Sequence, residues 1–259
     1  MLGFPSATRP EGGHFRRNLL KSVTFQIKFQ RNTEIVEVFK DKKDSLKTKF
    51  PIASPITFST THISFKDKTP IIQTASSSNC GYQFKTINND KTLAITEDTF
   101  TYTISGPTYQ NFYETISEIK SDFFPILEEC NVTNCSRIAI RKINLVEPKD
   151  PAYSSDSLFA LAFNKNLVHN FSVFPDKKCI TSGITNVTLE KDDKRLNLIY
   201  GILSPNPKKK QILLDIDLFL INQNVGLELI ESTLAEINTE IFNIFSWALS
   251  EEMKADISN

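Results

Sequence analysis

Residues 100–127, FTYTISGPTYQNFYETISEIKSDFFPIL, change from one hydrophobic period to another. Phe100 and Tyr102 alternate with threonines, which is typical of a β-strand with one buried face. After the turn, large apolar residues recur every three or four positions, which predicts an amphipathic helix over about 112–127. Pro125 is expected to distort or end this helix early. The stretch therefore predicts a strand, a turn and a helix whose apolar stripe packs on a sheet.

The chain before this stretch is predicted to be mostly sheet. Val23, Phe25, Ile27 and Phe29 alternate with polar residues and so share one strand face. Short β-rich runs separated by polar and proline-containing breakers are typical of an antiparallel meander. These runs are 35–39, 56–65, 71–74, 82–87 and 93–96, and residues 136–146 supply a strand that closes the unit.

The second half repeats this order. Strands are predicted at 184–189, 196–203 and 212–221, followed by the longest helical pattern of the chain, 225–255. A shift of 118 residues places Phe112 on Ile230 and Ile116 on Leu234. We therefore predict an α+β fold of two pseudo-repeated halves, each an antiparallel sheet covered by a long helix. The alternative is that any two strand-turn-helix units align through shared periodicity.

The predicted organisation has three parts. Residues 1–20 form an extended N-terminal arm, 21–150 form the first half and 151–259 form the second half. The boundary near residue 150 is inferred from the most linker-like stretch of the chain, Glu147-Pro148-Lys149-Asp150-Pro151. The two ends have opposite charge, with nine Lys/Arg against four Asp/Glu in 1–43 and one Lys against nine Asp/Glu in 211–259. Such asymmetry indicates either a basic surface for a polyanion or two chain ends that neutralise each other in the fold, and we favour the second.

Composition predicts a globular cytoplasmic protein. The 259 residues carry 30 Lys+Arg and 30 Asp+Glu with 20 Phe, which lies far from the composition of disordered chains. No run approaches the ~20 apolar residues of a membrane span, and the N-terminal region lacks the apolar core of a secretory signal. Four cysteines are too sparse for a disulfide scaffold, which favours a reducing compartment. We therefore expect no contact with a membrane.

Several separated pieces resemble a known family. They are Pro10-Glu11 through His14, Arg17-Asn18 with Leu20, the run 137–144 (RIAIRKIN) and the run 213–217 (LLDID). In order and spacing they resemble an uncharacterised, sporadically distributed prokaryotic family of proteins of roughly 250 residues. The resemblance implies two related α+β halves and supplies no catalytic residues. Its patchy distribution suggests mobile genes, as in defence or toxin-related systems.

Two charged pairs are the candidate chemistry. Asp215 and Asp217 leave the same face of one strand, the geometry that holds Mg²⁺ in nucleotidyl-transfer sites, but the usual Gly-rich phosphate turn is missing. Arg137 and Arg141 also share a face, ~13 Å apart, and could clamp phosphates or carboxylates. Equally, the arginines could meet Asp215 and Asp217 on a neighbouring strand, and we expect this internal pairing. Asn144, in the same run as the arginines, is a further candidate binding residue.

The basic segment at Arg16 and Arg17, next to Phe15, has the composition of a nucleic-acid surface, with an ordinary solvated basic rim as the alternative. Isolated histidines and unmatched cysteine spacing provide no catalytic or zinc signature, so no cofactor is predicted. We therefore predict a non-enzymatic protein-binding module, part of a mobile defence or toxin-related system, whose partner is another protein or a second copy of the chain. The alternatives are a nucleotide- or nucleic-acid-binding protein that uses the basic strand face, and a metal-dependent enzyme that uses the Asp-X-Asp strand.

Overall fold

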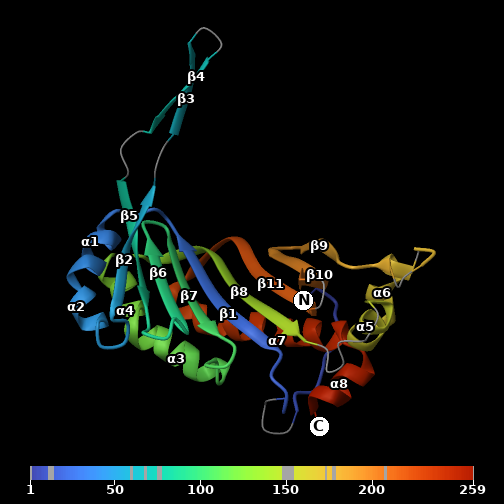
Figure 1. Cartoon of the computed structure of the whole chain (residues 1–259). Helices are drawn as coiled ribbons and strands as arrows, with labels where there is room; N and C mark the ends of the chain where they lie inside the picture. Colours follow the sequence, from blue (N-terminus) through green and yellow to red (C-terminus); the bar gives the residue numbers. More distant parts are fainter. Residues whose placement is uncertain are drawn as a thin grey trace.

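The computed structural model describes residues 2–10, 15–58, 61–66, 69–74, 78–147, 155–172, 174–176, 179–206 and 209–258. Within this part the chain is an α+β protein (Figure 1). The strands are β1 Leu20–Phe29, β2 Ile52–Phe58, β3 Thr61–Lys66, β4 Thr69–Thr74, β5 Ser78–Lys85, β6 Lys91–Thr96, β7 Thr99–Ser105, β8 Asn134–Val146, β9 Gly183–Lys191, β10 Lys194–Asn206 and β11 Lys209–Gly226. The helices are α1 Glu34–Asp41, α2 Lys43–Leu46, α3 Phe112–Asp122, α4 Phe124–Glu129, α5 Ser155–Ala162, α6 Lys165–Ser172, α7 Ile230–Ala248 and α8 Glu251–Ser258, with a 3-10 turn at Leu227–Leu229 before α7.

Nine strands form one antiparallel sheet in the order β2-β5-β6-β7-β1-β8-β11-β10-β9. The strands β3 and β4 pair with each other in a separate hairpin. The centre of the large sheet is β1 against β8, where Phe25 lies opposite Ile140, and Ile140 in turn lies opposite Leu218 of β11. These side chains are fully buried, so the alternation of apolar residues predicted from the sequence places them in the core.

The helices gather on one side of the sheet (Figure 1). Phe112 of α3 contacts Phe25 with ring centroids 6.3 Å apart, and Phe39 of α1 contacts Phe84 of β5 at 6.2 Å. The helix α7 packs on β8 and β11. Because side chains alternate along a strand, the residues that lie between the helix-contacting residues of each strand point to the opposite, helix-free face. That face carries Thr24, Arg141 and Asp217 side by side across three neighbouring strands.

Three of the expected elements need correction. The run 56–65, predicted as one strand, contains the end of β2 and most of β3, which belong to different sheets. Residues 35–39, predicted as a strand, belong to helix α1, in which Ile35, Val36 and Phe39 are buried. Their spacing of one and four residues is a single helical stripe, which in so short a run resembles a strand. The predicted helix 225–255 is also wrong at its start and in its continuity, because β11 extends to Gly226 and Leu249 has extended backbone between α7 and α8. Pro125 acts as expected, since α3 ends at Asp122 and the proline lies in the first turn of α4.

The N-terminal arm, residues 2–10 and 15–19, lies along α7 and α8. The Leu2 amide donates a hydrogen bond to Glu240 Oε1 at 2.5 Å, and the Ala7 amide donates to Asn243 Oδ1 at 3.0 Å. The Phe4 and Trp247 rings meet edge to face with centroids 5.0 Å apart, and Arg17 pairs with Asp256 at 2.6 Å. The basic beginning and the acidic end of the chain are therefore neighbours, as the favoured interpretation of the charge asymmetry required. Their mutual neutralisation is limited, because Arg31 and Lys42 pair with Glu97 and Glu129 from other parts of the chain. Among the described helices, none has both the length and the apolar character that crossing a membrane requires.

Candidate functional site

The arginines predicted as a binding pair lie on the helix-free face of the sheet and have acidic partners there. Arg141 donates from Nε to Oδ1 of Asp215 at 2.9 Å and from Nη2 to Oδ2 at 2.6 Å, and Nε also lies 3.2 Å from Oδ2. Arg137 Nη2 lies 3.6 Å from Asp217 Oδ2. The strands β8 and β11 are adjacent, as the internal pairing required. Both carboxylates thus lie beside guanidinium groups, and within the described residues no cluster of three or more His, Cys, Asp or Glu is placed to hold a metal.

Arg137 is held less by its carboxylate than by an aromatic ring. Its guanidinium lies 3.5 Å from the centroid of the Phe219 ring, and its buried Nε has no hydrogen-bond partner. Burial lowers the pKa of Arg137, and burial likewise raises the pKa of Asp217, since its neighbouring arginines only partly offset the loss of water. This pair is therefore weaker than the Arg141–Asp215 pair, which has bidentate geometry.

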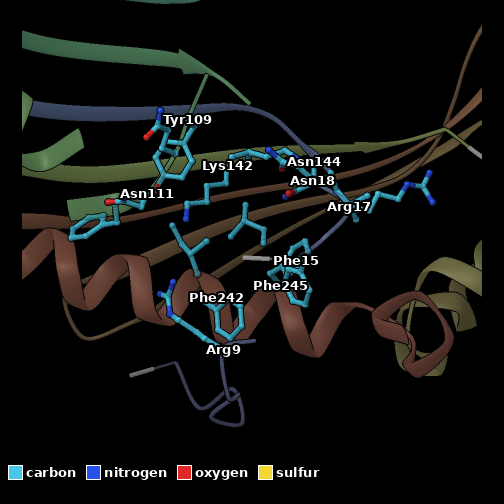
Figure 2. A pocket seen from close by; sticks show the side chains of 16 residues that line it. Arg9, Phe15, Arg17, Asn18, Tyr109, Asn111, Lys142, Asn144, Phe242 and Phe245 are labelled. Atoms are coloured by element: carbon cyan, nitrogen blue, oxygen red, sulfur yellow. Dashed lines mark hydrogen bonds between the residues drawn. The ribbon is translucent and has the colours of Figure 1, made fainter. Parts of the chain in front are cut away.

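The other side of β8 carries a different group of polar residues. Lys142 and Asn144 alternate with Arg141 and so face α7 and the core. Between β8, α7, the N-terminal arm and the start of α3 lies a pocket of about 270 Å³ (Figure 2). Its polar lining is Arg9, Arg17, Asn18, Gln110, Asn111, Lys142 and Asn144, and its rings are Phe15, Tyr109, Phe112, Phe242 and Phe245. Of the residues predicted to bind, the fold thus brings Arg17 and Asn144 together, whereas Arg16 is exposed and lies outside the lining.

Lys142 is the unusual group of this pocket. Its Nζ donates a hydrogen bond to Asn238 Oδ1 of α7 at 2.7 Å and lies 5.5 Å from the centroid of the Tyr109 ring. Burial, together with the smaller effect of the nearby positive charge of Arg9, lowers the pKa of Lys142 to about 7. The amine is therefore present in comparable amounts as the neutral and charged forms near neutral pH. Figure 2 shows the side chain extending from the strand towards α7, with Arg9 and Phe242 on the helix side.

The sequence analysis did not single out Lys142, although a signal for it exists. In the run 137–144, Ile138 and Ile140 occupy every second position and are buried, and Lys142 is the next residue in that series. A lysine at a core position of a central strand must either be paired or lose its charge. The alternation that puts Arg137 and Arg141 on one face of the strand therefore also predicts Lys142 on the opposite, apolar face.

The electrostatics of the pocket favour an anion. Arg9, Arg17 and Lys142 line it, and no Asp or Glu does. Arg17 already pairs with Asp256 at 2.6 Å, but in the described part of the chain no carboxylate forms an ion pair with Arg9 or Lys142. The Arg9 guanidinium lies 4.7 Å from the Phe242 ring centroid, so it is placed by an aromatic ring instead. A phosphate or carboxylate could thus be bound here by cations while the phenylalanine rings cover an apolar, planar part.

The fold and the pocket together define an α+β protein built on one antiparallel sheet, with a basic, ring-lined pocket between its helix-covered face and the N-terminal arm. Models of known protein families match no part of the chain, and no curated protein matches it.

Proposed function

We propose that the chain is a non-enzymatic binding module whose pocket binds a small anionic ligand with a planar ring. A nucleoside monophosphate and an aryl phosphate are examples of this ligand class. One observation carries this proposal, namely that Arg9 and Lys142, two cationic side chains for which the described residues provide no ion-pair partner, line a cavity of about 270 Å³ that no Asp or Glu lines. That volume lies just below the roughly 300–1,000 Å³ usual for ligand sites, which favours a single ring system. Cations in a partly desolvated pocket attract an anion more strongly than they would at an open surface.

Removing the least constrained cation tests this site. Arg9→Ala is expected to weaken binding of a nucleoside monophosphate about tenfold, because one charge-assisted contact is lost. Isothermal titration calorimetry at low salt measures the affinity. Arg16→Ala is the matched control and should change the affinity less than twofold, because Arg16 lies outside the pocket lining. The proposal fails if neither nucleoside monophosphates nor aryl phosphates bind, or if both variants weaken binding equally.

Binding should also depend on pH in one direction. In the free protein Lys142 has a pKa of about 7, and a bound anion next to the amine raises that pKa. Binding then takes up a proton at any pH between the two values, so affinity falls by up to about tenfold per pH unit above pH 7 and is nearly constant below it. Calorimetry in buffers of different ionisation enthalpy detects the proton. Affinity that stays constant from pH 6 to pH 9 would contradict this linkage.

A protein partner is the second candidate, and the helix-free face of the sheet favours it. This face runs across β7, β1, β8 and β11, and its two arginines, Arg137 and Arg141, lie beside Asp217 and Asp215. A surface with paired charges suits another protein, or a second copy of this chain, better than a polyanion. A monomer by light scattering, together with the lone chain after purification from its native cell, would exclude this candidate. The same pairing weakens both the nucleic-acid proposal for Arg137 and Arg141 and the metal proposal for Asp215 and Asp217.

We also infer two pseudo-repeated halves, each an antiparallel sheet covered by a long helix. The order β1-α1-α2 followed by β5-β6-β7-α3-α4 parallels the order β8-α5-α6 followed by β9-β10-β11-α7-α8. In the sheet the two sets run β5-β6-β7-β1 and β8-β11-β10-β9, mirrored about the β1–β8 pair. This order favours a boundary just before β8 (Asn134–Val146), earlier than the boundary expected near residue 150, where residues 148–151 of the linker-like stretch lie outside the described residues. Superposing the two sets tests the repeat, which fails if their strands overlay only with α3 and α7 running in opposite directions.

A cytoplasmic location, membership of the sporadic prokaryotic family and a role in a mobile defence system remain proposals of the sequence. Neighbouring genes would test the last of them, since a stable pairing with a toxin-like gene supports it and an unrelated neighbourhood in each genome opposes it.

A further inference from the structure

We infer that Lys142 is a nucleophilic amine that condenses with the carbonyl group of an anionic aldehyde or ketone bound in the pocket, forming an imine. This inference rests on the proposed anion-binding function and deepens it by naming the reactive group of the ligand.

The hydrogen bond of Lys142 leaves its lone pair available. Asn238 Oδ1 is an acceptor, so it engages one N–H of the amine. No other hydrogen bond or ion pair joins Nζ to a described residue. Arg9 from the arm and the Tyr109 ring from the segment before α3 lie near the amine, and the remaining polar residues of the lining are neutral apart from Arg17. The pocket lies directly in front of this amine (Figure 2).

Two other partly buried lysines, Lys194 and Lys91, have acidic partners. Lys194 Nζ lies 3.0 Å from Glu240 Oε2, and Lys91 Nζ lies 2.8 Å from Glu118 Oε2. A neighbouring carboxylate holds an amine in its ammonium form, which has no lone pair to donate. Desolvation next to a second cation has the opposite effect and is a recognised way to activate a lysine towards carbonyl groups. Lys142 and Arg9 have that relationship.

The pocket also provides what the reaction needs around the amine. Arg9 can hold the anionic group of the ligand, which fixes the carbonyl carbon near Nζ. Phe242, Phe245 and Ile216 line the same cavity and limit the access of water, which would otherwise hydrolyse the imine.

The reaction balances without an oxidant or a further reactant. The lone pair of Nζ attacks the carbonyl carbon, and the π electron pair moves to oxygen. One proton passes from nitrogen to that oxygen, which gives a carbinolamine. A second proton transfer releases the oxygen as water while the C=N bond forms. The products are one imine and one water, and the step is reversible.

The experiment uses the full chain and pyridoxal 5′-phosphate, an aromatic aldehyde that carries a phosphate. After incubation at pH 7, sodium borohydride reduces any imine, and mass spectrometry of a digest locates the label. At this pH about half of Lys142 is neutral, whereas an ordinary lysine is neutral in roughly one molecule in 10³. Labelling of Lys142 is therefore expected to exceed that of Lys194 and of exposed Lys21 at least tenfold. Pyridoxal without the phosphate should label Lys142 at least tenfold less.

Two further measurements separate the inference from the function on which it rests. Lys142→Arg cannot form the imine, so any label that remains in this variant reports condensation at other amines, and the difference between the total label of the two chains reports Lys142. Pyridoxine 5′-phosphate, an alcohol that cannot condense, reports binding alone by calorimetry. If it binds and the aldehyde labels only exposed lysines or the N-terminal amine, the inference is overturned and the proposed function stands. If neither compound binds, both are overturned.

Discussion

Between pH 7 and pH 10, the free energy of unfolding of the wild-type protein is expected to rise by about 3 kcal/mol more than that of a Lys142→Met variant. Lys142 has a pKa of about 7 in the folded protein, against about 10.4 in an unfolded chain. Between these values the unfolded state binds more protons than the folded state, so the free energy of unfolding rises with pH. Methionine has a similar length and no charge, and therefore removes this dependence.

The comparison is designed to cancel other titrations. Urea unfolding of both chains at pH 7, 8.5 and 10 measures the difference in the free energy of unfolding, and groups common to both chains drop out of it. The loss of the hydrogen bond to Asn238 shifts the free-energy difference by the same amount at every pH. The titration of the Lys142 amine is therefore read from the slope of that difference against pH. Lys21→Met, on an exposed side chain, should give no slope. A constant difference for Lys142→Met would mean that the amine stays charged in the folded protein.

Local patterns were sufficient to predict most of the sheet and its charge pairs. The alternation from Val23 to Phe29 gave β1, and the two-residue spacing of Asp215 and Asp217 placed both carboxylates on one face, where the arginines of β8 reach them. These features depend on the side-chain period within one strand and on a single neighbouring strand. A short apolar run such as 35–39 covers too few helical turns for its spacing to distinguish a helix from a strand. For this reason residues 35–39, which belong to α1, were predicted as a strand.

The pocket could not be predicted in the same way. It is assembled from segments far apart in the chain, with Arg9 and Arg17 in the arm, Lys142 in β8 and Phe242 in α7. Their meeting depends on the path of the arm along α7, which is set by hydrogen bonds from backbone amides to Glu240 and Asn243. Backbone donors leave no pattern in a sequence, whereas the buried polar side chains that accept from them do. Polar residues on the apolar side of a long helix were therefore the available signal.

Gly106→Ala is expected to destabilise the protein by about 3 kcal/mol and to disturb the pocket at the same time. A Cβ atom at Gly106 would lie 1.6 Å from the Leu20 carbonyl oxygen and 2.3 Å from its carbon, so the backbone at the start of β1 must move. Gly106 also donates from its amide to the Lys21 oxygen at 2.8 Å and accepts from Asn18 Nδ2 at 3.0 Å. Both hydrogen bonds tie the beginning of β1 to the end of β7.

Gly226→Ala is the matched control. Its added Cβ would meet the Glu228 carboxylate at 2.3 Å, which is the far end of a flexible side chain that can turn away, so the expected change is below about 1 kcal/mol. Urea unfolding at pH 7 measures both variants, and equal stabilities would contradict the steric argument. Because Asn18 and Leu20 line the pocket beside Lys142, the folded fraction of Gly106→Ala should also bind an aryl phosphate more weakly than Gly226→Ala does. If Gly106→Ala loses stability but binds the aryl phosphate as well as Gly226→Ala does, then α7 and not the start of β1 sets the shape of the binding site.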